Sequence, residues 1–319
     1  MSAHPKDVFT LAGHTRAEAE MADALESRRL HHAWLITGPE GVGKATLAYR
    51  MARAALGAKR IGPRPLDVSP SDRVAQRIAA SSHPDFFVLE RALNERGKLK
   101  RDISAEQTRE LPGFFTLAAS EGGKRVAIVD AVDDLNRFGA NALLKILEEP
   151  PPNTLLILIC HAPGAALATI RSRCRRLDLR PLSDEEMKGV VDADEDTLRL
   201  AAGRPGRALA LQAQEGLAND IASALKQLER KGAEALLQIA SARSPDPGQR
   251  LALVLDALED WIRRTVVSAG GKGPRAAALA EAYAALEALR AERDELDLDP
   301  THALARAALI LDRAQAART

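Results

Sequence analysis

The sequence contains very little cysteine: only Cys160 and Cys174 occur among its 319 residues. Two thiols cannot build the thiolate site of a structural zinc ion, and they do not suggest a disulfide framework. Scarce cysteine is typical of a protein in a reducing compartment, so we expect a cytoplasmic location.

The sequence also lacks an excess of charge of one sign and a long apolar run. Its formal net charge is +1. A protein that binds nucleic acid unaided usually carries a basic excess, so any DNA contact should be local or shared with partners. No stretch approaches the roughly 20 apolar residues of a membrane span. The first residues, "MSAHPKDVFT", do not resemble a signal peptide, and we expect no membrane partner.

What the sequence does contain is an alternation of buried strands and helices. Five short apolar segments, interpreted as strands, alternate with helical patterns and lie at 32–38, 86–90, 124–130, 154–160 and 175–179. This order predicts an α/β fold, in which helices cover both faces of a parallel sheet. Three helix starts are expected from capping patterns, at Thr15 with Glu18, Ser104 with Gln107, and "SDEE" at 183–186.

The chain is long enough for two or three domains. The α/β part is expected to end near Pro181, and "GRPG" at 203–206 interrupts the helical region that follows. From about Leu217 onward only helical patterns occur, with Trp261 as an expected buried anchor. We therefore predict boundaries after residues 181 and 216.

A phosphate-binding loop lies between the first strand and its helix, in "GPEGVGKAT" at 38–46. Its glycines, Gly38, Gly41 and Gly43, would let backbone amides approach an anion, and Lys44 could reach terminal phosphates. The next residue should be a Ser or Thr that coordinates magnesium, but it is Ala45. Thr46 lies roughly 100° further round the helix and should not replace that hydroxyl.

A second catalytic position is also empty. Asp130 ends the third strand and could serve as a metal-side carboxylate, but Ala131 stands where an active ATPase would carry the water-polarising glutamate. Asp133 and Asp134 are interpreted as helix-capping or solvated acids. We therefore predict no significant ATPase activity, no required cofactor and no metal site. Passive ATP binding is left open, and its candidate residues are Gly38, Gly41, Gly43, Lys44, Thr46 and Asp130.

Four segments together resemble the delta-prime subunits of bacterial DNA polymerase III clamp loaders, which are AAA+ proteins. They are "HHAWLITGPEGVGKATLA", "HPDFFVL", "NALLKILEEPPPNTLLIL" and "TIRSRC", spread over residues 8–180. The resemblance implies a RecA-like AAA+ domain at 1–181, a helical lid at 182–216 and a helical collar at 217–319 that holds a hetero-pentameric ring. It implies gamma/tau and delta subunits, the sliding clamp and primer-template DNA as partners in replication.

The resemblance separates ATP-hydrolysing motor subunits from a non-motor stator, and Ala45 and Ala131 favour the stator. Gly206 stands at the position of the motor subunits' nucleotide-sensing arginine, and the adjacent Arg207 should face elsewhere. In the matched "SRC" triplet, Arg173 is the arginine finger that enters the ATP site of a neighbouring motor subunit. Such a subunit would belong to a DNA-directed DNA polymerase holoenzyme without being an ATPase or polymerase itself.

The sequence departs from the family at one place: residues 58–82 contain no cysteine, where many relatives carry a four-cysteine zinc module. We interpret this segment as a metal-free replacement and expect no zinc. Two alternatives stay open, an autonomous AAA+ or P-loop ATPase and a motor-type clamp-loader subunit with an unorthodox site. For Arg173 the alternative is a solvated basic turn. Cys174 is expected to be a small, inert thiol.

Overall fold

The computed structural model describes residues 4–27, 29–95, 99–100, 102–121, 123–162, 168–231, 236, 239, 244, 246–296 and 298–316. The chain forms two compact units, of which the first comprises residues 2–190 and 203–206 and the second residues 191–202 and 207–319. In these described stretches, no helix combines the length and the apolar character needed to cross a membrane.

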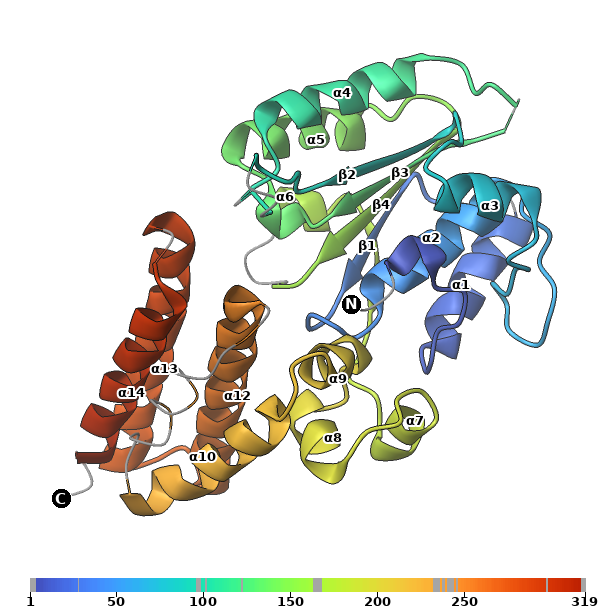
Figure 1. Cartoon of the computed structure of the whole chain (residues 1–319). Coiled ribbons are helices and arrows are strands. Elements are labelled where there is room, and N and C mark those ends of the chain that lie inside the picture. The colour runs from blue at the N-terminus through green and yellow to red at the C-terminus, as the bar shows by residue number, and fades with distance from the viewer. Residues whose placement is uncertain are drawn as a thin grey trace. The chain divides into compact units, whose positions relative to one another are not determined.

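The first unit is built on a parallel sheet, drawn in Figure 1. Its strands are β1 (Ala33–Thr37), β2 (Phe86–Glu90), β3 (Arg125–Asp130), β4 (Thr154–Cys160) and β5 (Arg175–Asp178), in the order β2-β3-β4-β1-β5. Every neighbouring pair is parallel. The predicted α/β fold is confirmed, and the carboxyl ends of β1, β3 and β4 lie at one edge of the sheet.

Helices cover both faces of this sheet (Figure 1). Alternate residues of β1 point into opposite cores: Trp34 and Ile36 pack in the core that contains α1 and α2, and Leu35 packs in the core that contains α4 and α5. The helical segments of this unit are η1 (Pro5–Asp7), α1 (Thr15–Glu26), α2 (Lys44–Ala55), α3 (Arg73–Ala79), α4 (Ala105–Thr116), η2 (Val132–Asp134), α5 (Arg137–Glu148), α6 (Ala168–Arg171) and α7 (Asp184–Lys188).

Two of the three predicted capping patterns are confirmed. Ser104 with Gln107 and Ser183 with Glu186 each form a capping box. The prediction for Thr15 with Glu18 is wrong, because His14 is the N-cap of α1 and makes no side-chain capping bond. The carboxylate of Glu18 is instead fully buried, where it forms ion pairs with Arg50 and Arg64 in a tertiary network.

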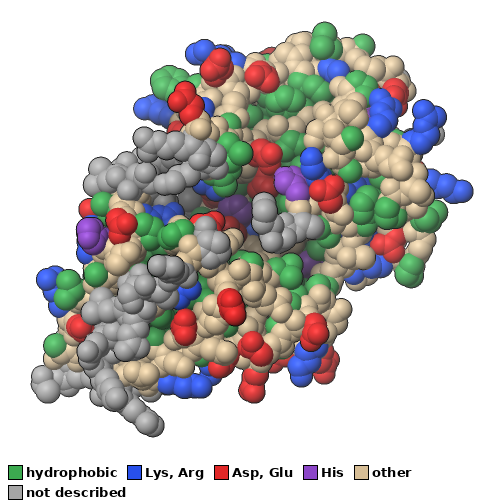
Figure 2. All heavy atoms as spheres, in the orientation of Figure 1, with side chains coloured by type: hydrophobic (Ala, Val, Ile, Leu, Met, Phe, Trp, Pro, Cys, Tyr) green, Lys and Arg blue, Asp and Glu red, His purple; other side chains and the backbone are tan. Residues whose placement is uncertain are grey.

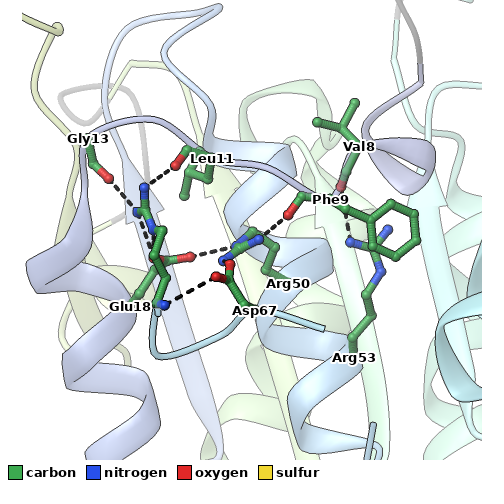
Figure 3. A network of polar contacts seen from close by, with 9 residues as sticks. Val8, Phe9, Leu11, Gly13, Glu18, Arg50, Arg53 and Asp67 are labelled. Atoms are coloured by element: carbon green, nitrogen blue, oxygen red, sulfur yellow. Dashed lines mark hydrogen bonds and ion pairs between the residues drawn. The ribbon is translucent and has the colours of Figure 1, made fainter. Parts of the chain in front are cut away.

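That network, shown in Figure 3, ties α2 to the cysteine-free segment. Glu18 Oε1 lies 2.5 Å from Arg50 Nε, and Glu18 Oε2 lies 2.6 Å from Arg64 Nη2. Arg50 also pairs with Asp67 at 2.7 Å. Buried charges of opposite sign with such short contacts offset one another's desolvation, and removing one of them leaves an uncompensated charge.

The same arginines hold the N-terminal segment in place. Arg64 donates hydrogen bonds to the carbonyl oxygens of Leu11 and Gly13, and Arg50 donates to that of Phe9. Arg53 donates to the carbonyl oxygen of Val8 at 3.0 Å (Figure 3). These charged hydrogen bonds and the ion pairs above thus anchor residues 64–67.

In the described part of the chain, a metal ion has no comparable set of ligands. Within these residues, no group of three or more His, Cys, Asp or Glu side chains could hold a metal ion.

The second unit is helical in its described elements. Trp261 is buried in its core, as predicted, and Leu200 and Leu211 share that core with Leu217. The boundary after residue 216 and the role of residues 217–319 in assembly stay predictions. The elements are α8 (Glu195–Ala201), α9 (Pro205–Gln212), α10 (Leu217–Lys231), α12 (Pro247–Ser268), α13 (Pro274–Leu296) and α14 (Pro300–Ala316).

Candidate functional site

The phosphate-binding loop connects β1 to α2, as the sequence predicts. Gly38, Gly41 and Gly43 have φ angles of +145°, +79° and +110°, which residues other than glycine rarely adopt. At Gly38 the restriction is also steric, because a Cβ would lie 2.5 Å from the carbonyl oxygen of Leu179. The glycines therefore give this strand-to-helix turn its shape.

The ammonium group of Lys44 is bound by its own loop. Its Nζ donates to the carbonyl oxygens of Gly38 at 2.6 Å and Pro39 at 2.8 Å, and the residue is only 3% exposed. Burial lowers its pKa to about 8, although the nearby carboxylates of Glu40 and Asp130 oppose that shift. Two of its three N–H donors are thus used inside the loop.

Ala45 and Ala131 leave both catalytic positions without a functional group. Ala45 is partly buried against the core that contains α1 and α2. Ala131 is fully buried in that core, directly after β3. Thr46, one position beyond Ala45 in α2, is partly exposed. A methyl group can neither coordinate magnesium nor polarise water, so this site lacks two parts of a phosphate-hydrolysing centre.

Acids follow β3 beside the loop. Burial and the neighbouring Glu90 raise the pKa of Asp130 to about 6, partly offset by Lys44. His161 Nε2, at the end of β4, lies 4.0 Å from Asp130 Oδ1, and burial lowers the pKa of that imidazole. Asp130 is thus a carboxyl group that burial keeps closer to its neutral form, with a histidine beside it.

The interpretation of Asp133 as a capping or solvated acid is wrong. Its carboxylate accepts hydrogen bonds from the backbone N–H groups of His161, at 2.6 Å, and Ala162, at 3.2 Å. Asp134 pairs with Arg91 at 3.2 Å. The segment after β3 is therefore fastened to the end of β4. The sequence could not show this, because the two segments are distant along the chain.

Gly206 sits directly on the phosphate-binding loop within the first unit. Its N–H donates to the carbonyl oxygen of Gly41 at 2.8 Å, and a Cβ at this position would lie 2.9 Å from the Cα of Gly41. The position matched to the sensing arginine thus has no room for any side chain in this conformation. Arg207 forms an ion pair with Asp260 within the second unit, at 2.5 Å.

Arg173 lies in the turn between α6 and β5. Its Nη1 donates to the carbonyl oxygen of Thr169 at 3.0 Å and to Ser172 Oγ at 3.3 Å, and its Nη2 lies 2.9 Å from Glu148 Oε1. The side chain is 35% exposed. In contrast to Lys44, this cation lies at the surface. Burial raises the pKa of the adjacent Cys174 thiol to about 12, which supports an inert thiol.

The arginines beside Arg173 are paired with acids. Arg175 stacks on Trp34, 4.8 Å from the ring centre, and pairs with Glu20. Arg176 pairs with Asp178 at 2.9 Å. On the face drawn in Figure 2, basic and acidic side chains lie interspersed. This mixture agrees with the near-zero net charge. The acidic partners of Arg175 and Arg176 indicate that the turn is not simply a basic patch.

Comparisons with known proteins identify the family to which this chain belongs. The family model for "DNA polymerase III, delta subunit" matches residues 13–183. The chain is 33% identical over 243 residues to the delta' subunit of DNA polymerase III from Pseudomonas aeruginosa, covering 72% of this chain and 69% of that protein. It is 34% identical over 217 residues to the Escherichia coli delta' subunit, covering 64% of this chain and 63% of that protein.

More distant likenesses extend over more of the chain. The Escherichia coli tau subunit is 28% identical over 253 residues, which cover 78% of this chain and 38% of tau. A gamma subunit-related protein from Thermotoga maritima has a solved structure that covers 92% of this chain and 99% of its own, at 16% identity and a TM-score of 0.44. The family match over more than half of the chain, together with the Pseudomonas aeruginosa relative, shows that this chain belongs to the delta' subunit family of the DNA polymerase III clamp loader.

Proposed function

We propose that this chain is the non-motor, stator subunit of the clamp loader and helps to load the sliding clamp onto primed DNA. Its partners would be gamma/tau and delta subunits in a hetero-pentameric ring, the sliding clamp, and primer-template DNA contacted through the complex. Membership of the delta' family supports this proposal, and the matched stretches span 69% and 63% of the two delta' relatives. The protein would act in the cytoplasm, where bacterial DNA is replicated.

The state of the phosphate-binding loop carries the non-motor part of the proposal. Lys44 is bound by the loop's own carbonyl groups, and Ala45 and Ala131 cannot supply the magnesium ligand and the water-polarising acid. A nucleotide would have to displace Lys44 from the loop carbonyls before it gained that contact. The chain would therefore hydrolyse no ATP and require no cofactor, even if nucleotide were bound passively.

The chemical contribution of this chain would be Arg173, supplied in trans. A guanidinium is permanently charged, and its planar fork of N–H donors matches phosphate oxygens. In the ATP site of a neighbouring motor subunit it would stabilise the charge that develops on the transferred phosphoryl group. The partly exposed position of Arg173 and its place in "SRC" at 172–174 support this role.

Reconstitution tests the proposal directly. Gamma/tau and delta subunits are combined with or without this chain, and clamp loading onto primed DNA is measured together with DNA-stimulated ATP hydrolysis. We expect loading only with this chain present, and no hydrolysis by the chain alone. Equal loading without it would contradict the proposal.

A motor subunit is the second candidate, because the loop keeps its glycine geometry, Lys44 and Asp130. That alternative predicts ATP hydrolysis by the purified chain with magnesium, and its loss in Lys44→Ala. Turnover equal to that of gamma/tau would favour the motor and exclude the stator.

We also propose that the cysteine-free segment functions without zinc. The support is the set of ion pairs that joins Arg64 and Asp67 to Glu18 and Arg50. Metal analysis of protein purified without chelators should give well below one zinc ion per chain. A stoichiometric value would refute the metal-free interpretation of residues 58–82.

A further inference from the structure

The side chain proposed to act in trans is held by an acid from another element of its own chain. Glu148, the last residue of α5, places Oε1 2.9 Å from Arg173 Nη2. We infer that Glu148 is a positioning residue for Arg173, which holds the guanidinium in the orientation that a neighbouring nucleotide phosphate requires. This inference rests on the proposed trans role of Arg173.

The contacts of Arg173 restrain the guanidinium without using all its donors. Thr169 O and Ser172 Oγ accept hydrogen bonds from Nη1, and Glu148 Oε1 forms an ion pair with Nη2. A guanidinium has five N–H donors, and within the described residues no contact uses Nε–H. The two hydrogen bonds and the ion pair therefore restrain the orientation of the group while N–H donors remain for a phosphate oxygen.

Stability alone gives a weak reason for this ion pair. Arg173 is 35% and Glu148 51% exposed, and such exposed pairs contribute little to folding because water screens them. Arginine, however, loses much side-chain freedom when it is ordered. A carboxylate that orders it in advance reduces the entropy lost when it reaches its target.

The position of Glu148 is itself well defined. Leu143, Ile146 and Leu147 of α5 are buried against the sheet, so the last turn of the helix is anchored. Glu149 N–H donates to the carbonyl oxygen of Lys145 at 3.0 Å and closes that turn. The "LLKILEE" segment thus places one acidic side chain beside Arg173. This ion pair links two segments, "LLKILEE" and "SRC", that are separate motifs in the sequence.

The test uses the reconstituted clamp loader with four single variants of this chain and one double variant. Glu148→Ala removes the acceptor, and Glu148→Gln keeps an acceptor oxygen without the charge. Arg173→Ala removes the proposed finger. Glu149→Ala is the matched control, because Glu149 is the exposed neighbour and its side chain makes no hydrogen bond or ion pair with the described residues. Ring assembly and the thermal unfolding midpoint are measured for each.

The expected result is a change in kcat rather than in binding. Glu148→Ala should lower kcat for DNA-stimulated ATP hydrolysis about three- to tenfold, with KM for ATP unchanged, because misorientation affects the transition state. Glu148→Gln should recover part of the rate, and Glu149→Ala should match the wild type. Adding Glu148→Ala to Arg173→Ala should cause no further loss, since the acid acts only through the arginine.

Each failure has its own signature. If Arg173→Ala lowers the rate but Glu148→Ala and Glu148→Gln do not, or if they raise it, Glu148 does not position the finger and the trans role stands. If Arg173→Ala is fully active, the trans role is wrong and the inference fails with it. If Glu148→Ala fails to assemble, the Glu148→Gln complex decides: a normal kcat overturns the inference, and a reduced kcat with normal assembly supports it.

Discussion

Lys44 and Arg173 are two cations of the same α/β unit, and they differ in what occupies their donors. Lys44 is 3% exposed and donates to two carbonyl oxygens of its own loop. Arg173 is 35% exposed and is held by an acid at the surface. The first cation is bound by the chain's own loop, whereas the second lies at the surface and has an N–H donor that no contact with the described residues uses. A retained motif and an available functional group are therefore different things.

The surroundings of the two cations sharpen this contrast. Beside Lys44, Asp130 is a carboxyl group whose pKa is raised to about 6, so its charge at neutral pH opposes folding. Around Arg173, each of the neighbouring arginines described above has an acidic partner. The phosphate-binding loop thus keeps groups that destabilise the protein without a complete catalytic site, which favours the interpretation of the loop as inherited structure.

The largest effect should come from Arg173. In the reconstituted complex, Arg173→Ala should lower hydrolysis at the adjacent site by up to about 10³-fold, although the other ATP sites will mask part of this loss. Arg173→Lys should not restore activity, because lysine lacks the planar fork. Arg176→Ala is the control, with assembly checked for all. If the complex that contains Arg173→Ala hydrolysed ATP at the normal rate, Arg173 would have no role in the neighbouring site, and the proposed difference from Lys44 would be wrong.

The next effect concerns stability in the unit that carries Lys44. Glu18→Gln should lower the free energy of unfolding by about 3–5 kcal/mol, because it removes the fully buried carboxylate that pairs with both Arg50 and Arg64 and leaves the buried Arg50 with Asp67 alone. Glu26→Gln breaks the exposed pair with Arg60, and should cost about 1 kcal/mol or less. Urea unfolding of the full chain measures both. Equal losses in the two variants would show that the buried network is not what anchors residues 64–67.

A smaller effect, of opposite sign, is expected at Asp130. Its pKa is about 6 in the folded chain and 3.8 ordinarily, so the folded state binds the proton more tightly and its stability falls as pH rises through this window. Asp130→Asn should therefore stabilise the protein at pH 7, by at most about 3 kcal/mol. The gain should vanish below about pH 4.

Unfolding curves at several pH values, with Asn in place of the exposed Asp23 as control, measure this difference. A stabilisation that does not depend on pH would mean that the carboxyl charge is not its cause. A loss of stability at pH 7 would contradict the view that Asp130 is a destabilising remnant.

The smallest effect should follow Lys44→Met. The apolar side chain is of similar length and removes a buried charge, so clamp loading by the reconstituted complex should change by less than about twofold. The unfolding midpoint should change little, because the removal of a buried charge is offset by the loss of the donor to the carbonyl oxygens of Gly38 and Pro39. A strong loss of loading with normal assembly would show that Lys44 takes part in function, and that the contrast with Arg173 is wrong.

Much of the fold and part of the site follow from local patterns in the sequence. The five strands, the glycine loop and the capping boxes at Ser104 and Ser183 each depend on residues within a few positions of one another. The empty catalytic positions at Ala45 and Ala131 were equally visible, because a methyl group has the same chemistry in any fold. Such features are encoded over short distances, so a single sequence is enough to predict them.

Only the tertiary structure decided how the charged side chains are paired. By local spacing Glu18 fits a capping box with Thr15, but it is buried between Arg50 and Arg64, which approach from distant segments. The same holds for Lys44 with its loop carbonyls and for Arg173 with Glu148. A charge that leaves water needs whichever partner the packed elements bring near, and that partner is set by the topology of the chain rather than by its neighbours in sequence.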